Sequence, residues 1–184
     1  AYRGNERYRD AQGTLNRLSA GAGSSILDFE KSYLEARLFL QAGEPVKAAE
    51  AARSAGQMAV TRKESTKLYD LMVEIELGRG DYESALESAL SLAEALNLRF
   101  VGTRRDRLFK RIDEIIDRLD EKSENTLELI YEYVGILTNY GQYRRARSLL
   151  LRNMGNWTGH SKQKAYFKLA WIDGFRLNFP EESL

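Results

Sequence analysis

Few side chains in this sequence could act in acid–base or metal chemistry. His160 is the only histidine and has no carboxylate near it at metal-ligand spacing, and the chain has no cysteine. Carboxylates stand close together in two places, Glu74 with Glu76 and Asp113 with Glu114. Both pairs fall in charge-rich segments with helical periodicity, which favours solvated helix faces or i to i+4 ion pairs over an acid and base couple. We predict a surface position for His160, no catalytic residue and no bound metal or cofactor.

Motifs for phosphate binding and for serine hydrolysis are missing from the sequence. It contains no G-x-x-x-x-G-K-[ST] loop, no G-x-G-x-x-G turn and no G-x-S-x-G elbow. The sequence therefore favours a binding protein over an enzyme.

Two basic clusters carry the strongest local charge. They are Arg104, Arg105, Arg107, Lys110 and Arg111, and then Arg144, Arg145, Arg147 and Arg152. Such clusters could follow a phosphate backbone. However, Asp106, Asp113 and Asp117 are interleaved with the first cluster, and a formal net charge of +1 provides no global field. Nucleic acid is disfavoured as a partner, although RNA binding or ligand sensing remains a third functional alternative.

Composition indicates a folded, soluble chain. Its 184 residues, of which 43% are hydrophobic, can bury a continuous core in one compact domain or a short solenoid. No apolar run approaches the roughly 20 residues that a membrane-spanning helix needs. The sequence starts at Ala1, so we expect a chain that is processed or cut from a larger one, in the cytoplasm or the periplasm.

Residues 32–55 have the pattern of a helical hairpin. Gly43 suits the positive φ that ends a helix, and Pro45 suits the first turn of the next. Small residues at helical spacing on the second helix let a neighbour approach closely; these are Ala48, Ala52 and Ala55. Ala36 and Phe39 share one face of the first helix.

The same order of features returns twice. The interval from Gly43 to Gly80 is close to a repeat period of about 34 residues. The interval from Gly80 to Gly141 is too long for one repeat and too short for two, which requires an extra helix or a degenerate repeat between them. The second copy holds Tyr69, Met72, Val73, Gly80, Tyr82, Ala85 and Ala89. The third holds Ile130, Tyr133, Val134, Leu137, Gly141, Ala146 and Leu150.

Capping residues predict where later helices begin. Thr61, followed by Glu64, opens one, and Thr103, followed by Asp106, opens a helix with an apolar stripe that ends near Leu119. Ser161 is the expected N-cap of the last helix, after a loop that contains His160 and a Trp157 packed onto the adjacent helix.

This arrangement resembles the tetratricopeptide repeat family. The resemblance implies an all-α fold, a right-handed α-solenoid of about nine antiparallel helices in a single domain, with a non-repetitive helical bundle as the alternative. The expected parts are an N-terminal helix and linker (1–22), repeat 1 (26–60), repeat 2 (61–98), an inserted helix or degenerate repeat (103–121), repeat 3 (124–153) and a C-terminal helix (161–178).

The resemblance also implies a protein or peptide partner, bound in a groove lined by the first helices of the hairpins. The candidate groove residues are Glu30, Tyr33, Arg37, Leu40, Gln41, Lys67, Asp70, Glu74, Leu77, Glu128, Tyr131, Thr138 and Asn139. Tyr33 and Tyr131 are the expected anchors, since aromatic residues often dominate binding energy. Places that hold a carboxylate clamp in chaperone-binding members carry Tyr33, Arg37, Leu71 and Glu128 here, so that clamp is absent.

A second hypothesis is self-association through the last helix. Phe167, Trp171 and Phe175 form an aromatic stripe there, and an uncovered stripe of this kind usually marks an interface.

Overall fold

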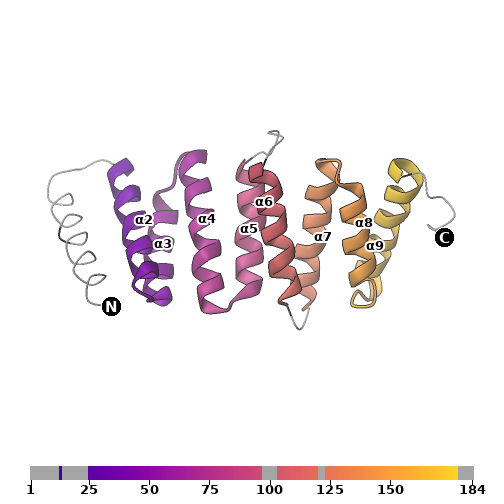
Figure 1. Ribbon diagram of the computed structural model, residues 1–184, viewed down its shortest axis with the longest axis horizontal. Helices are drawn as coiled ribbons and strands as arrows, with labels where there is room; N and C mark the ends of the chain where they lie inside the picture. Colours follow the sequence, from indigo (N-terminus) through magenta and orange to yellow (C-terminus); the bar gives the residue numbers. More distant parts are fainter. Residues whose placement is uncertain (1–12, 14–24, 97–102, 120–122, 178–184) are drawn as a thin grey trace. The chain divides into compact units, whose positions relative to one another are not determined.

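A computed structural model describes residues 13, 25–96, 103–119 and 123–177, and every regular element in these ranges is helical (Figure 1). The predicted all-α class is therefore confirmed for the described residues. Apart from Gly13, the expected N-terminal helix and linker at 1–22 lie outside them. Backbone contacts divide the chain into two compact units, Ala1–Asn97 (unit 1) and Leu98–Leu184 (unit 2). A single domain over 1–184 stays a prediction.

Unit 1 contains two consecutive helical hairpins. Its helices are α2 (Ser25–Gln41), α3 (Pro45–Met58), α4 (Arg62–Arg79) and α5 (Tyr82–Leu96). Each helix packs against the next in sequence, and α2 also contacts α4. The first helices of the two hairpins are thus neighbours.

Unit 2 contains one further hairpin with a helix on either side of it in sequence. Its elements are α6 (Thr103–Asp117), α7 (Glu124–Asn139), α8 (Tyr143–Asn153), α9 (Gly159–Ile172) and the π-helix η1 (Asp173–Leu177). α7 packs on α8, and α8 packs on α9 and η1. The helix expected before the third hairpin is present as α6.

One turn geometry joins the helices of all three hairpins. Gly43, Gly80 and Gly141 have φ values of 75°, 73° and 71°, in the left-handed region that glycine tolerates best. In each turn the following residue donates its N–H to a carbonyl five residues earlier: Glu44 to Phe39 at 2.9 Å, Asp81 to Glu76 at 3.0 Å and Gln142 to Leu137 at 2.9 Å. This is the hydrogen bond of a Schellman helix end. The predicted equivalence of the three glycines is confirmed.

Small residues form the seam of the first hairpin, as their spacing predicts. Ala48, Ala52 and Ala55 are at most 1% exposed, and Ala36 of α2 is fully buried with them. Side chains without a γ carbon let α2 and α3 approach closely along this seam.

The apolar stripes of the later helices also point inward. Fully buried members of α7 are Ile130, Tyr133, Val134 and Leu137, and those of α6 and α4 that are fully or almost fully buried include Ile112, Ile116, Val73 and Ile75. Asn153 takes the place of a small residue at the end of α8. It is buried, and its amide donates to the Leu149 carbonyl at 2.8 Å, so the polar group is paired.

Among the predicted caps, Thr61 is confirmed and Ser161 is wrong. Thr61 accepts a hydrogen bond from the Glu64 N–H, and the Glu64 carboxylate accepts one from the Thr61 N–H at 2.8 Å. These backbone donors lower the pKa of Glu64. Ser161 does not cap α9, because the Lys162 N–H already bonds to the Thr158 carbonyl and the helix starts at Gly159. The exposed His160 therefore lies in a helix, not in a loop.

Candidate functional site

An ion pair bridges the two first helices of unit 1. Lys67 Nζ of α4 lies 2.6 Å from Glu30 Oε1 of α2 and 5.6 Å from the ring centre of Tyr33. The Tyr33 ring in turn stacks on the buried Phe29 at 5.9 Å. Three predicted groove residues are therefore brought together here, and their charges neutralise one another.

The other predicted groove residues of unit 1 differ in how far their side chains are exposed to solvent. Those that are exposed, as a groove-lining role requires, are Arg37, Gln41, Asp70 and Glu74. Leu71, the expected clamp position, is buried in the core formed by α2, α3 and α4. It cannot take part in a surface site, because its side chain packs inward.

In unit 2, the first-helix face holds a cavity of about 210 Å³ instead, which we call the unit 2 pocket. Its walls come from α7, α9 and the connection before α9, and they consist of Leu127, Glu128, Tyr131, Trp157, Ser161 and Lys164. Two predicted groove residues, Glu128 and Tyr131, are among them. Asn139 is exposed elsewhere on α7, and Thr138 is buried, so its predicted groove position is wrong.

Equivalent residues build the two faces. Glu30 precedes the turn glycine Gly43 by the same interval as Glu128 precedes Gly141. Tyr33 and Tyr131 likewise occupy matching places before these two glycines. In each unit, the next first helix supplies a lysine, Lys67 or Lys164. Among the described residues, no ion pair joins Glu128 to Lys164, and the space between their helices is open.

Trp157 is the largest side chain in the wall of the unit 2 pocket. It lies in the five-residue connection between α8 and α9, whereas only three residues connect α3 to α4. The indole is 2% exposed, so the predicted packing of Trp157 onto a helix is confirmed, and the same side chain forms part of the pocket wall. The indole therefore lines the same cavity as Glu128 of α7 and Lys164 of α9.

The pocket combines apolar walls with hydroxyl and charged groups. Leu127 is buried and Tyr131 is partly buried; burial raises the pKa of the Tyr131 phenol, so this group stays neutral and can donate a hydrogen bond. Glu128 and Lys164 are exposed at the rim. Sequence reasoning missed Ser161, Lys164 and the lining role of Trp157. The sequence did contain a signal for these positions, because Glu-x-x-Tyr occurs twice and each time a later first helix carries a lysine.

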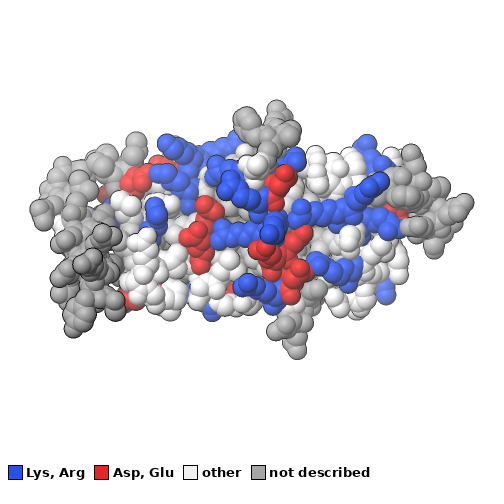
Figure 2. All heavy atoms as spheres, viewed as in Figure 1, with Lys and Arg blue, Asp and Glu red and all other residues white. Residues whose placement is uncertain are grey.

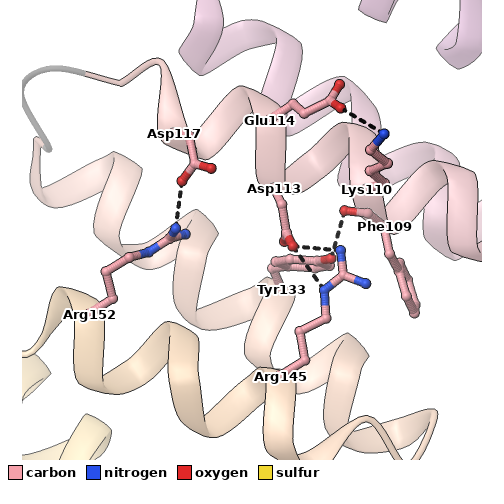
Figure 3. Close-up of polar contacts among 8 residues, drawn as sticks. All are labelled: Phe109, Lys110, Asp113, Glu114, Asp117, Tyr133, Arg145 and Arg152. Carbon is pink, nitrogen blue, oxygen red and sulfur yellow. Dashed lines mark hydrogen bonds and ion pairs between the residues drawn. The ribbon is translucent and has the colours of Figure 1, made fainter.

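Five of the nine residues in the two basic clusters form ion pairs with carboxylates of the same unit. Figure 3 shows Arg145 of α8 reaching Asp113 of α6 at 2.6 Å, while Arg152 reaches Asp117 at 2.5 Å. Further ion pairs in these clusters join Arg105 to Asp106, Lys110 to Glu114 and Arg147 to Asp173. Blue and red side chains accordingly lie interleaved over α6 in Figure 2. These ion pairs reduce the charge that the clusters could offer to a phosphate backbone.

A buried tyrosine supports the α6–α8 contact from beneath. The Tyr133 hydroxyl donates to the Phe109 carbonyl at 3.1 Å, and Arg145 lies over the Phe109 ring at 5.6 Å (Figure 3). Burial raises the pKa of Tyr133 well above its usual value, and the charge of Asp113 raises it further. Tyr133 is therefore a structural group here.

Of the four carboxylates considered for acid–base chemistry, three form ion pairs. Glu76 bonds to Arg79 at 2.6 Å, Asp113 to Arg145 and Glu114 to Lys110. In the part of the chain that the structure describes, no group of three or more metal-ligating side chains comes together, and no helix is long and apolar enough to cross a membrane.

The aromatic residues of the last helix differ from one another in exposure. Phe167 and Phe175 are 76% and 77% exposed, whereas Trp171 is partly covered by its neighbours. Their predicted position along one side of the helix leaves two large apolar rings in solvent.

Comparison with known proteins provides no relative. No protein-family model, no curated protein and no solved structure matches this chain.

Proposed function

We propose that this chain is a non-catalytic protein-interaction scaffold, a right-handed solenoid of tetratricopeptide-type hairpins, which binds a peptide segment of a partner protein. The observation that carries the proposal is the unit 2 pocket on the face formed by α7 and α9. The three equivalent hairpin turns support the repeat architecture, since the same backbone geometry recurs at Gly43, Gly80 and Gly141.

The pocket defines the chemistry of the segment it would accept. A volume of about 210 Å³ suits one large apolar side chain, which would pack against Trp157 and Leu127. Glu128 and Lys164 at the rim have no ion-pair partner among the described residues, so a basic and an acidic residue on either side of that apolar residue would pair with them. Tyr131 supplies a rigid aromatic wall and a hydroxyl donor.

Site-specific photo-crosslinking tests this proposal. A benzophenone amino acid placed at Tyr131 should crosslink a protein in an extract of the source organism, because this side chain lines the pocket. The matched control carries the same group at Glu87, which is exposed on the second helix α5. A segment identified by mass spectrometry is then synthesised, and its affinity for the Tyr131→Ala chain should fall about tenfold or more.

A further variant checks the proposed charges. Lys164→Glu should weaken a segment whose acidic residue faces α9, and reversing that residue in the segment should restore binding. Equal crosslinking at Tyr131 and Glu87, or an unchanged affinity for Tyr131→Ala, would contradict the proposed site.

A further inference from the structure

Phe167, Trp171 and Phe175 on α9 and η1 form the aromatic stripe, which contains the two most exposed large apolar side chains among the described residues of unit 2. Its members are spaced four residues apart, and in a regular α-helix this spacing drifts around the axis. The wider turn of η1 reduces this drift, so Phe175 lies nearer the side of Phe167 than it would in a continuous α-helix. Two rings that are 76% and 77% exposed form a surface that a partner could cover.

Cations flank the aromatic stripe and have no carboxylate partner among the described residues. Lys168 Nζ lies 5.0 Å from the centre of the Trp171 ring, and the Arg176 guanidinium lies 4.9 Å from the same ring. Arg176 also lies 5.5 Å from the ring of Tyr143, which meets Trp171 edge on. Asp173 is the only acidic residue in 159–177, and it is fully buried and bonded to Arg147.

The α6–α8 contact in the same unit combines the same kinds of side chain, and there the cations are paired with carboxylates. There Arg145 lies over the Phe109 ring and donates to Asp113, and a second aspartate four residues later binds Arg152. Aromatic ring, stacked cation and carboxylate are all present. On α9 and η1, the rings and the cations are present, but the one described carboxylate, Asp173, is bonded to Arg147 instead.

We infer that the aromatic stripe docks an acidic amphipathic helix of a partner protein. Apolar side chains of that helix cover Phe167 and Phe175, and carboxylates spaced four residues apart, as Asp113 and Asp117 are, pair with Lys168 and Arg176. A second copy of this chain fits less well, because a twofold contact would place the same cations opposite one another.

Selection from a displayed library tests the inference without a known partner. The library presents single helices with leucine fixed along one face and the flanking positions randomised among Glu, Lys, Gln and Ala. Panning against the full chain should enrich helices with glutamates four residues apart beside the leucine face. Enrichment of basic or uncharged helices, or no enrichment, would overturn the proposal.

Variants of exposed residues locate the binding of the selected helix. Phe167→Ser with Phe175→Ser should lower its affinity about tenfold or more, since this variant lacks the two rings that the helix covers. Lys168→Glu with Arg176→Glu should lower it about fivefold or more, and a helix with Lys in place of Glu should recover binding to this variant. Tyr166→Ser, on an exposed residue outside the stripe, is the control and should change little.

Two other occupants would contradict the inference. Sedimentation that shows a dimer lost in the Phe167→Ser, Phe175→Ser variant would assign the stripe to a second copy. Binding to mixed vesicles of phosphatidylcholine and phosphatidylserine, lost in the same variant, would assign it to an anionic membrane when no acidic helix is selected.

Discussion

The first-helix faces of the two units carry the same three residue types in different states. In unit 1, Glu30 and Lys67 form an ion pair beside Tyr33 that bridges α2 and α4. In unit 2, the equivalent Glu128 and Tyr131 face Lys164 across an open pocket. A shared residue pattern therefore does not specify a shared site. The state depends on how closely the two neighbouring helices approach.

The length and content of the connecting segment explain the difference. Val60, in the short connection before α4, is 84% exposed and does not separate the helices. Trp157, in the longer connection before α9, is buried and forms part of the pocket wall. The face with the buried aromatic ring is thus the one on which the glutamate and the lysine are not paired with each other.

The largest effect is expected from removing this ring. Trp157→Ala should reduce the free energy of unfolding of unit 2 by about 3–5 kcal/mol, because it deletes a large buried side chain. The remaining tryptophan, Trp171, also lies in unit 2, so its fluorescence during urea unfolding reports on this unit. The matched change in the other connection, Val60→Ala, should stay within about 0.5 kcal/mol. Similar small costs for both variants would contradict the role given to Trp157.

A smaller effect should appear at alkaline pH and should also come from unit 2. The pKa of Tyr133 is raised in the folded chain, so its contribution to stability is complete below pH 10 and is lost as the pH rises above that value, where the unfolded tyrosine ionises. The loss from this residue approaches about 1.4 kcal/mol per pH unit.

Tyr133→Phe isolates this contribution from the other nine of the ten tyrosines. Urea unfolding followed by circular dichroism at pH 9, 10 and 11 should show a shallower decline in stability for the variant. The equivalent position in unit 1, counted back from the turn glycine Gly80, is Met72, which does not titrate. Identical pH profiles for the two chains would show that Tyr133 ionises freely when folded.

The smallest effect concerns the ion pair between Glu30 and Lys67 in unit 1. A double-mutant cycle of Glu30→Gln and Lys67→Met should give a coupling energy of about 0.2–1 kcal/mol, since both side chains are partly exposed. The same cycle at Glu128 and Lys164 should give a coupling near zero in the absence of a partner. A coupling of equal size in both cycles would mean that the two faces are alike in solution.

Much of the fold could be predicted because its signals are local. Gly43, Gly80 and Gly141 mark turns since few other residues adopt their φ, and the alanine spacing on α3 marks the buried seam. The errors arose where a local signal competes with packing. Ser161 is a good cap residue, yet α9 starts at Gly159 because its first backbone hydrogen bond forms one turn earlier.

The sequence by itself determined the helices, their turns and the exposed aromatic stripe, because backbone geometry and helical periodicity depend on residues a few positions apart. Only the tertiary structure decided which charges are paired and where a pocket opens. Glu30 meets Lys67 across 37 residues and Arg145 meets Asp113 across 32, and these partners are chosen by the spacing of packed helices. At the pocket, Trp157 lines the same cavity as Glu128 and Tyr131 of α7, and no local pattern in the sequence encodes that neighbourhood.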